Sequence, residues 1–218
     1  PCVFHVSART VSTHALNIFG DHSDVMACRQ TGFAMLCEGN VQEVMDLSPV
    51  AHLAALSGKV PFINFFDGFR TSHEIQKIAV WDYKDLADMC DMDAVKAFRE
   101  HALNPEHPAM RGSHENGDTF FQHREACNQY YDALPEVVEK YMGKINEKLG
   151  TDYKLFNYYG APDADRVIIA MGSICDVAEE VIDYLTAKGE KVGLVKVRLY
   201  RPFSAKHLLA AIPETATQ

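Results

Sequence analysis

The residue types best suited to chemistry are concentrated in residues 67–74. This segment holds an acid, a glycine, an arginine, two hydroxyls, a histidine and a second acid, and it directly follows the apolar run 60–66. Ligands of open α/β sheets bind just beyond the carboxyl ends of strands, where loops gather polar groups. We therefore expect a binding site here. On composition alone, a solvated turn with a helix N-cap at Thr71 or Ser72 and Glu74 in the first helical turn is an equally good interpretation.

Two other positions carry groups that can bind anions. Arg9 follows the predicted strand 2–8, and its planar guanidinium can bind a carboxylate through paired hydrogen bonds, although a surface ion pair is the more ordinary role. Residues 171–173 form a strand-to-helix turn with free N–H groups. Without a G-x-G-x-x-G or a P-loop lysine, a plain capped turn is favoured there. The pattern around Leu16 and Ile18 favours core positions.

Composition and charge argue against several classes of function. The net charge is −9 and the basic residues are scattered, which argues against a nucleic-acid surface. No window approaches the roughly 18 apolar residues of a membrane span, and no basic-then-apolar leader opens the chain. The six cysteines form no C-x-x-C pair and the ten histidines no H-x-x-x-H pair. We therefore expect no zinc, iron–sulfur or other metal site within this stretch, and reduced thiols in a cytoplasmic protein.

Hydrophobic periodicity predicts an α/β protein with an open, mainly parallel sheet. The predicted strands are 2–8, 59–66, 166–172 and 191–200, with a short strand at 25–28. The predicted helices are 40–58, 83–90, 93–103, 136–149 and 173–188, with a short helix or turn at 14–19. Asn40 is the expected N-cap and Gly58 the expected C′ residue of the first long helix, and Pro49 should kink or split it.

Two longer-range features follow from the same pattern. The strand, helix and strand within 166–200 form a βαβ unit, whose crossover should be right-handed. A linker-like stretch at 160–163 places a domain boundary near residue 153. Residues 104–129 have two prolines, three histidines and little periodicity, so we expect them to be functional, covered by a partner or flexible.

Several blocks, taken in chain order, resemble pyruvate:ferredoxin (flavodoxin) oxidoreductase. They are Phe4-His5-Val6-Ser7-Ala8-Arg9, Ile18-Phe19-Gly20-Asp21-His22, Arg29-Gln30-Thr31-Gly32-Phe33-Ala34-Met35, residues 67–74, Asn104-Pro105-Glu106-His107-Pro108, Tyr153-Lys154-Leu155-Phe156, Gly160-Ala161-Pro162-Asp163 and Val197-Arg198-Leu199-Tyr200-Arg201-Pro202-Phe203. Because these blocks cover essentially the whole chain, the resemblance is specific.

The resemblance implies a fold and a place within a longer protein. Residues 1–152 are expected to form the later part of the family's first domain, an open, mainly parallel sheet of the pyrimidine-binding type found in thiamine-diphosphate enzymes. Residues 153–218 are expected to be the truncated start of the second domain, an α/β domain like the C-terminal domain of transketolase. Both chain ends are expected to be cuts through a longer polypeptide.

The resemblance also implies an activity. Enzymes of this family oxidatively decarboxylate pyruvate with coenzyme A to acetyl-CoA and CO₂. They use thiamine diphosphate with Mg²⁺, and they pass electrons through [4Fe-4S] clusters to ferredoxin or flavodoxin. The full-length protein is expected to be a homodimer. The glutamate that activates the cofactor lies upstream in the family and the cluster cysteines lie downstream, so this segment is expected to contain no catalytic residue and to be inactive alone.

Residue by residue, Arg9 matches the arginine that binds the pyruvate carboxylate, and Leu16 and Ile18 match apolar residues that line the same cavity. Asp67, Arg70 and Thr71 are expected at the edge of the site. Two alternatives stay open. The chain could belong to a sister 2-oxoacid:ferredoxin oxidoreductase with a different side-chain pocket. It could also be a non-catalytic segment that forms dimer or interdomain surface, which would suit residues 104–129.

Overall fold

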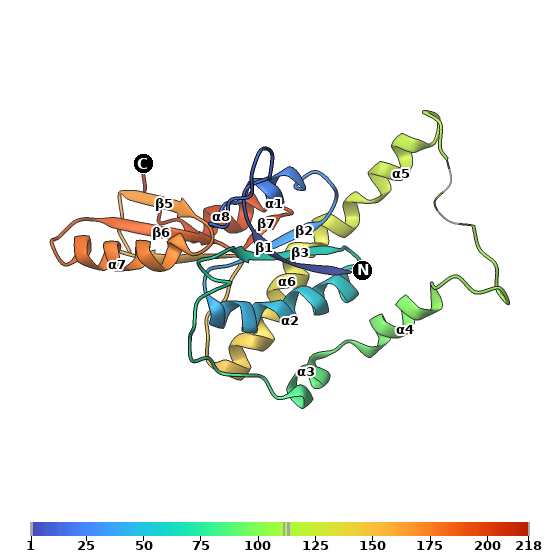
Figure 1. The fold of residues 1–218 in the computed structure, drawn as a ribbon, viewed down its shortest axis with the longest axis horizontal. Coiled ribbons are helices and arrows are strands. Elements are labelled where there is room, and N and C mark those ends of the chain that lie inside the picture. The colour runs from blue at the N-terminus through green and yellow to red at the C-terminus, as the bar shows by residue number, and fades with distance from the viewer. Residues whose placement is uncertain (1, 111, 113, 218) are drawn as a thin grey trace.

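The computed structural model describes residues 2–110, 112 and 114–217, which fold into two β-sheets joined by helices (Figure 1). The strands are β1 (Val3–Ala8), β2 (Ala34–Glu38), β3 (Phe62–Asp67), β4 (Phe156–Gly160), β5 (Arg166–Ala170), β6 (Val192–Val197) and β7 (Leu199–Arg201). The helices are α1 (Ser23–Ala27), α2 (Val41–Gly58), α3 (Tyr83–Met89), α4 (Met92–Glu100), α5 (Phe120–Ala126), α6 (Asn128–Leu149), α7 (Ile174–Thr186) and α8 (Ala205–Ala211).

The first sheet confirms the predicted parallel architecture. Within the described residues its strand order is β1-β3-β2-β7, with β1, β3 and β2 parallel and β7 antiparallel at one edge. Helix α2 connects β2 to β3 and packs with α6 on one face of this sheet (Figure 1). Apolar side chains of both helices and of the central strands form the main core. The carboxyl ends of β1 and β3 therefore lie side by side, as required for a ligand site at that edge.

The sequence pattern does not predict strand β2, and the predicted strand at 25–28 is wrong. All five residues of β2 are buried, because the strand is covered on both faces, so it lacks the alternation that marks a half-exposed strand. Residues 25–27 instead belong to α1 and Cys28 is its C-cap; the Met26 N–H donates to the His22 carbonyl at 2.8 Å. Periodicity cannot separate so short an apolar run into strand or helix.

Helix α2 is continuous, so Pro49 does not split it. The predicted N-cap is confirmed, because the Asn40 side chain accepts the Glu43 N–H at 3.0 Å. The predicted C′ residue is wrong: Gly58 is still helical, and the left-handed residue is Lys59, at φ 57°. A Cβ on Gly58 would lie 2.5 Å from Leu134 Cδ1, so this glycine permits the close contact between α2 and α6.

The second sheet has the strand order β4-β6-β5 in the described residues. Strands β5 and β6 are parallel and α7 connects them, which confirms the predicted strand–helix–strand unit. The predicted strand 191–200 is two strands. Strand β6 pairs within the second sheet, whereas β7 pairs with β2 in the first. Arg198 stands between them, so one continuous stretch of chain joins the two sheets.

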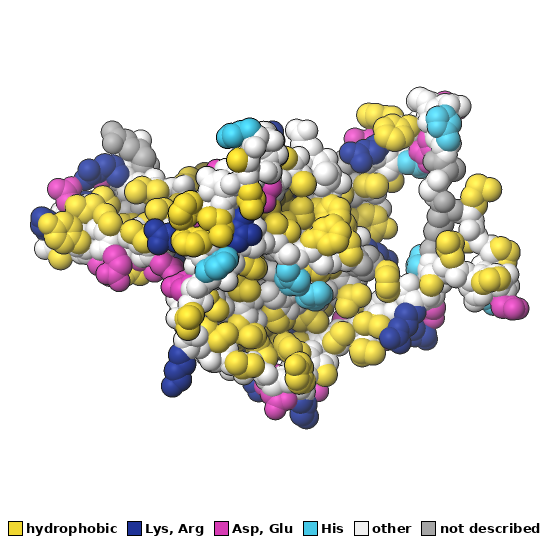
Figure 2. All heavy atoms as spheres, in the orientation of Figure 1, with side chains coloured by type: hydrophobic (Ala, Val, Ile, Leu, Met, Phe, Trp, Pro, Cys, Tyr) yellow, Lys and Arg dark blue, Asp and Glu magenta, His cyan; other side chains and the backbone are white. Residues whose placement is uncertain are grey.

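Helices α3, α4 and α5 lie along an extended arm that leaves the body after β3 and returns at α6 (Figure 1). The predicted helices 83–90 and 93–103 correspond to α3 and α4, although α4 ends at Glu100. Residues 104–129 are mostly irregular, but they include α5, and α6 begins at Asn128 rather than at residue 136. No residue of α3, α4 or α5 is buried, and apolar side chains are visible over the arm in Figure 2.

A buried carboxyl group lies at the end of β2. Glu38 is fully buried, and neither of its oxygens accepts a hydrogen bond within the described residues. Burial, and then the nearby Glu43 carboxylate, raise the pKa of Glu38 well above its ordinary value. Between the pKa of the unfolded chain and the raised pKa of the folded state, the folded protein holds a proton that the unfolded chain releases, so stability falls as pH rises through that range.

Replacing Glu38 with glutamine is expected to stabilise the chain increasingly as pH rises above the pKa of the unfolded glutamate. Glutamine keeps the shape of glutamic acid but cannot ionise. It therefore removes the loss of stability that comes with the raised pKa of Glu38. At pH values above the folded-state pKa this loss is about 1.4 kcal/mol for each unit by which the pKa is raised, and at lower pH it is smaller. Urea unfolding at several pH values measures the difference. Glu147→Gln, at an exposed position, is the matched control and should show no such trend. A Glu38→Gln difference that is constant with pH would contradict a buried neutral acid.

Candidate active-site edge

The parallel register brings Arg9 and residues 67–74 together at one edge of the sheet. Ala8 is paired with Asp67, and the Gly68 N–H donates to the Ala8 carbonyl at 2.9 Å. Arg9 and Gly68 are thus the residues that directly follow the paired residues Ala8 and Asp67. The sequence placed each group after a strand, and the structure shows that the two strands are neighbours.

Arg9 is held by its own loop. Its backbone N–H donates to Asp24 Oδ2 at 3.0 Å, and its Nε donates to the Ile18 carbonyl at 2.9 Å. An isolated β-bridge joins Arg9 to Gly20 across the loop. Within the described residues no carboxylate pairs with the guanidinium, and its two terminal nitrogens have no hydrogen-bond partner. The ordinary reading of Arg9 as half of a surface ion pair therefore finds no support in this part of the chain.

The apolar residues of the same loop are exposed. Leu16 is 75% exposed and Ile18 is 45% exposed, and Phe19 beside them is also exposed. The reading of Leu16 and Ile18 as core residues is therefore wrong. An irregular loop has no fixed period, so the spacing of its apolar residues does not predict whether their side chains are buried. These side chains belong to the loop whose Ile18 carbonyl accepts the hydrogen bond from Arg9 Nε.

Asp67 connects three distant segments. His22 Nε2 contacts Oδ1 of Asp67, while the Ser173 N–H and hydroxyl donate to Oδ2 at 2.8 and 2.5 Å. Burial alone would raise the pKa of Asp67, but the hydrogen bonds from His22 and Ser173 lower it below its ordinary value. The turn at 171–173 therefore binds the protein's own Asp67 carboxylate, whereas the predicted cap is wrong in that the Ser173 side chain accepts no hydrogen bond from its own helix.

This Ser, His and Asp do not form a nucleophile triad. In such a triad the histidine bonds to the hydroxyl and the acid bonds to the histidine. Here His22 and Ser173 both bind Asp67, and within the described residues no hydrogen bond joins His22 to Ser173. The contact instead holds the start of α7 against the end of β3. No sequence signal could have shown it, because Asp67 and Ser173 are 106 positions apart.

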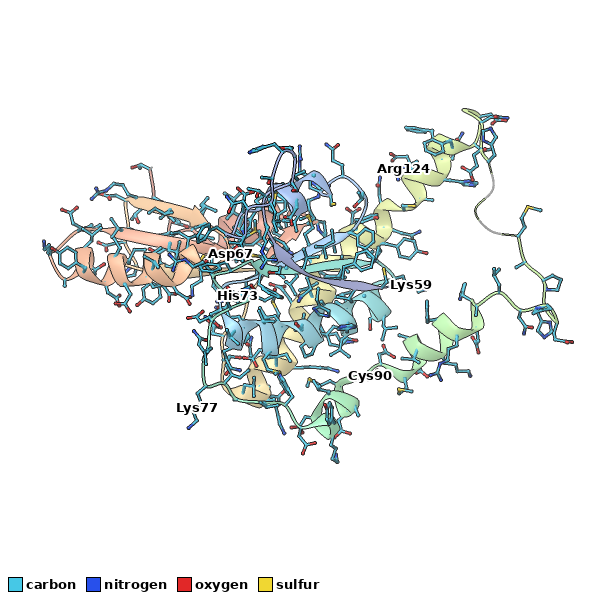
Figure 3. The ribbon with its side chains drawn as sticks, in the orientation of Figure 1. Lys59, Asp67, His73, Lys77, Cys90 and Arg124 are labelled. Carbon is cyan, nitrogen blue, oxygen red and sulfur yellow. The ribbon has the colours of Figure 1, made fainter. Side chains whose placement is uncertain are left out.

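Thr71 and Arg70 differ in their surroundings. Thr71 is buried, and its hydroxyl donates to the Gly39 carbonyl at 3.2 Å, so it holds the turn against the end of β2. Arg70 is exposed and lines a cavity of about 440 Å³ with His73 and Glu74 on one side and the start of α7 on the other. Figure 3 shows Asp67 and His73 in this region.

The predicted N-cap at Thr71 or Ser72 is wrong, because residues 68–73 form a hydrogen-bonded turn and no helix follows directly. The turn bonds back to the strand end. The Thr71 and Ser72 N–H groups both donate to the Asp67 carbonyl, at 3.1 and 3.3 Å.

The side chains of the described residues do not come together as the ligands of an iron–sulfur cluster. Among the described residues, no three or more His, Cys, Asp or Glu side chains come together in a way that could hold a metal. Burial raises the pKa of the Cys37 thiol well above its ordinary value and that of Cys175 to about 12, whereas metal ligation needs thiolates. Across the same residues, every helix is too short or too polar to cross a membrane.

Comparison with known families agrees with this fold. Residues 1–143 match the family model described as "Pyruvate flavodoxin/ferredoxin oxidoreductase, thiamine diP-bdg", and residues 164–216 match "Pyruvate:ferredoxin oxidoreductase core domain II". The chain belongs to the pyruvate:ferredoxin/flavodoxin oxidoreductase family. This confirms the family that the sequence blocks indicated and the thiamine-diphosphate class of cofactor for its first domain.

Two relatives show how much of the family's length is present. The chain is 62% identical over 217 residues to a pyruvate-flavodoxin oxidoreductase of Enterobacter agglomerans, and 62% identical over 213 residues to a pyruvate:ferredoxin oxidoreductase of Moorella thermoacetica. These matches cover 100% and 98% of this chain. The chain spans only 18% of the length of each relative, and both relatives are enzymes.

A solved structure supports the fold. The chain is similar to a 2-oxoglutarate:ferredoxin oxidoreductase from Magnetococcus marinus, which was determined with 2-oxoglutarate, coenzyme A and succinyl-CoA bound. The TM-score is 0.60, the identity is 20%, and the match covers 96% of this chain and 39% of the other. At that identity the likeness supports the shared α/β fold of the oxidoreductase family and says nothing about this chain's substrate.

Proposed function

We propose that this chain is the part of a pyruvate:ferredoxin (flavodoxin) oxidoreductase that supplies the arginine for the pyruvate carboxylate. The observation that supports it is the state of Arg9, whose backbone and Nε are held while its two terminal nitrogens have no partner in the described residues. A guanidinium held in this way is preorganised to bind a planar carboxylate through paired hydrogen bonds.

The full-length enzyme oxidatively decarboxylates pyruvate with coenzyme A to give acetyl-CoA and CO₂. Thiamine diphosphate with Mg²⁺ supplies the chemistry that cleaves the 2-oxoacid when it is bound. The electrons pass through [4Fe-4S] clusters to ferredoxin or flavodoxin. The ligands for these groups belong to other parts of the enzyme, which we propose to be a cytoplasmic homodimer with no nucleic-acid or membrane partner.

Within this chain, Arg9 binds and orients the substrate. Its guanidinium holds the carboxylate end, which fixes the direction in which the 2-oxo carbon faces. The exposed side chains of Leu16 and Ile18 form the apolar wall beside it, and Asp67, Arg70 and Thr71 lie at the edge of the site. We propose residues 1–152 as the later part of the first domain and residues 153–218 as the start of the second.

A substrate panel on the full-length enzyme tests this function. Reduction of ferredoxin or a viologen dye is followed with pyruvate, 2-oxobutyrate, 2-oxoglutarate and the neutral amide pyruvamide. We expect kcat/KM to be highest for pyruvate and about 100-fold lower or more for pyruvamide, because the amide leaves the guanidinium without its charged partner. A preference for 2-oxoglutarate would identify a sister enzyme, and no oxidation of any 2-oxoacid would favour a non-catalytic segment.

A further inference from the structure

We propose that the turn after β3 positions the Arg9 guanidinium, with Gly68 and Phe69 as positioning residues. This inference rests on the proposed function of Arg9 as the carboxylate-binding group. It assigns a role to the polar segment 67–74, whose residue types suggested a site without saying what each residue does. Two separate contacts carry it, one through the backbone of Gly68 and one through the ring of Phe69.

Gly68 lies directly against the Arg9 side chain. A Cβ built on Gly68 would lie 2.6 Å from Arg9 Cγ, 2.9 Å from Arg9 Nε and 2.7 Å from the Ala8 carbonyl oxygen. These distances are too short for any side chain, and the Ala8 carbonyl belongs to a paired strand and cannot move away. A residue larger than glycine would therefore displace the arginine side chain.

The second loop glycine contributes to the same close packing. A Cβ on Gly20, which bridges to Arg9 across the loop, would lie 2.9 Å from the Gly68 carbonyl oxygen. The loop that carries Arg9 and the turn after β3 thus approach each other closely at Gly68 and at Gly20. Such contact leaves the start of the Arg9 side chain little freedom to change its direction.

Phe69 holds the loop from the other side. Its ring packs edge-on against Phe19, with ring centroids 4.8 Å apart. Phe19 follows Ile18, and the Ile18 carbonyl accepts the hydrogen bond from Arg9 Nε at 2.9 Å. The Phe69 ring therefore fixes the acceptor that orients the guanidinium.

Phe69 has an unusual backbone conformation. Its φ of 65° lies in the left-handed region, which a bulky residue rarely adopts. The Phe69 N–H donates to Ser72 Oγ at 2.8 Å, which helps to hold this conformation. Residues kept in such conformations gather at ligand clamps, because the surrounding structure determines them for a purpose other than local stability.

The functional consequence concerns substrate affinity. An arginine fork that is already oriented loses less freedom when it binds a carboxylate than a mobile one does. The carboxylate contact exists both in the bound substrate and during the reaction, so loosening the fork should raise KM more than it lowers kcat. A positioning role thus has a kinetic signature that a general loss of folding does not produce.

The test uses the full-length enzyme with Gly68→Ala, Phe69→Leu and Phe69→Tyr. We expect Gly68→Ala to raise KM for pyruvate about 10- to 100-fold, with kcat changed less than about threefold and thiamine diphosphate binding unchanged. Phe69→Leu should raise KM by a smaller factor. Phe69→Tyr keeps the aromatic ring, so its KM should equal that of the wild-type enzyme. Should Gly68→Ala not fold, the comparison of Phe69→Leu with Phe69→Tyr carries the test.

A double variant separates this inference from the proposed function. If Gly68 acts through Arg9, Gly68→Ala adds no further increase in KM once Arg9 is alanine. Effects that multiply, or a wild-type KM in both Gly68→Ala and Phe69→Leu, overturn the positioning role while leaving Arg9 in place. A wild-type KM in Arg9→Ala alone overturns the proposed function itself. Gly143→Ala is the matched control, since a Cβ there meets nothing within 4 Å.

Discussion

Arg9→Ala in the full-length enzyme is expected to lower kcat/KM for pyruvate by about 100- to 1000-fold, mainly through KM. The reason is the loss of the charge-assisted, paired hydrogen bonds that the guanidinium gives to the carboxylate. Arg9→Lys keeps the charge but not the paired geometry, so its loss should be intermediate. Steady-state kinetics give the split between kcat and KM, and titration with thiamine diphosphate checks that cofactor binding is retained.

Two controls make the Arg9 result specific. Arg99→Ala removes one positive charge from an exposed position on α4 and should leave the kinetics unchanged. Added guanidinium ion should partly restore the activity of Arg9→Ala, because it can occupy the vacated position beside the carboxylate. A full-length Arg9→Ala enzyme with wild-type KM, or one that has lost only its assembly state, would favour the non-catalytic alternative.

Arg198→Met is expected to destabilise the chain by about 3–5 kcal/mol, the largest stability effect we anticipate. Arg198 and Glu43 are both buried and form a two-point ion pair, with Nη1–Oε2 at 2.7 Å and Nη2–Oε1 at 2.9 Å. Removing the arginine leaves the Glu43 carboxylate buried without its partner. Urea unfolding of the two proteins at pH 7 measures the difference.

The pair also sets a dependence on pH. Burial alone would raise the pKa of Glu43, but the Arg198 charge and its hydrogen bonds lower it below its ordinary value. A carboxyl group whose pKa is lowered by folding stabilises the folded state at pH values above its pKa in the unfolded chain. That contribution is lost as pH falls through its pKa in the folded state. In Arg198→Met the Glu43 carboxylate has lost the partner that lowers its pKa, so we expect the wild-type advantage to shrink as pH falls and the Glu43 of the variant is protonated.

Comparison variants decide whether burial causes this effect. Arg166→Met breaks an exposed pair with Glu190 and should cost less than about 1 kcal/mol. The double variant Glu43→Leu with Arg198→Met removes both charges, so it should be more stable than Arg198→Met alone. Equal losses in Arg166→Met and Arg198→Met would contradict the importance of the buried pair.

The sequence also carries a signal for the buried pair. Arg198 interrupts the apolar stretch 191–200, and a charge in such a run needs a buried partner. The stretch reads as one strand by periodicity, yet it divides at that residue between two sheets. The signal shows that a partner exists but does not identify it, because Glu43 is 155 positions away.

Local pattern was enough for the parts of this protein whose structure is set by neighbouring residues. Strands β1 and β3, helix α2 with its Asn40 cap and the β5–α7–β6 unit follow from order and spacing along the chain, and the family follows from the resemblance of its sequence blocks. Tertiary packing alone decided the fully buried β2, the sharing of Asp67 between His22 and Ser173, and the contact of Gly68 with Arg9. Periodicity indicates which face of a helix or strand is buried. It does not indicate which distant segment packs on that face, and these features depend on that segment.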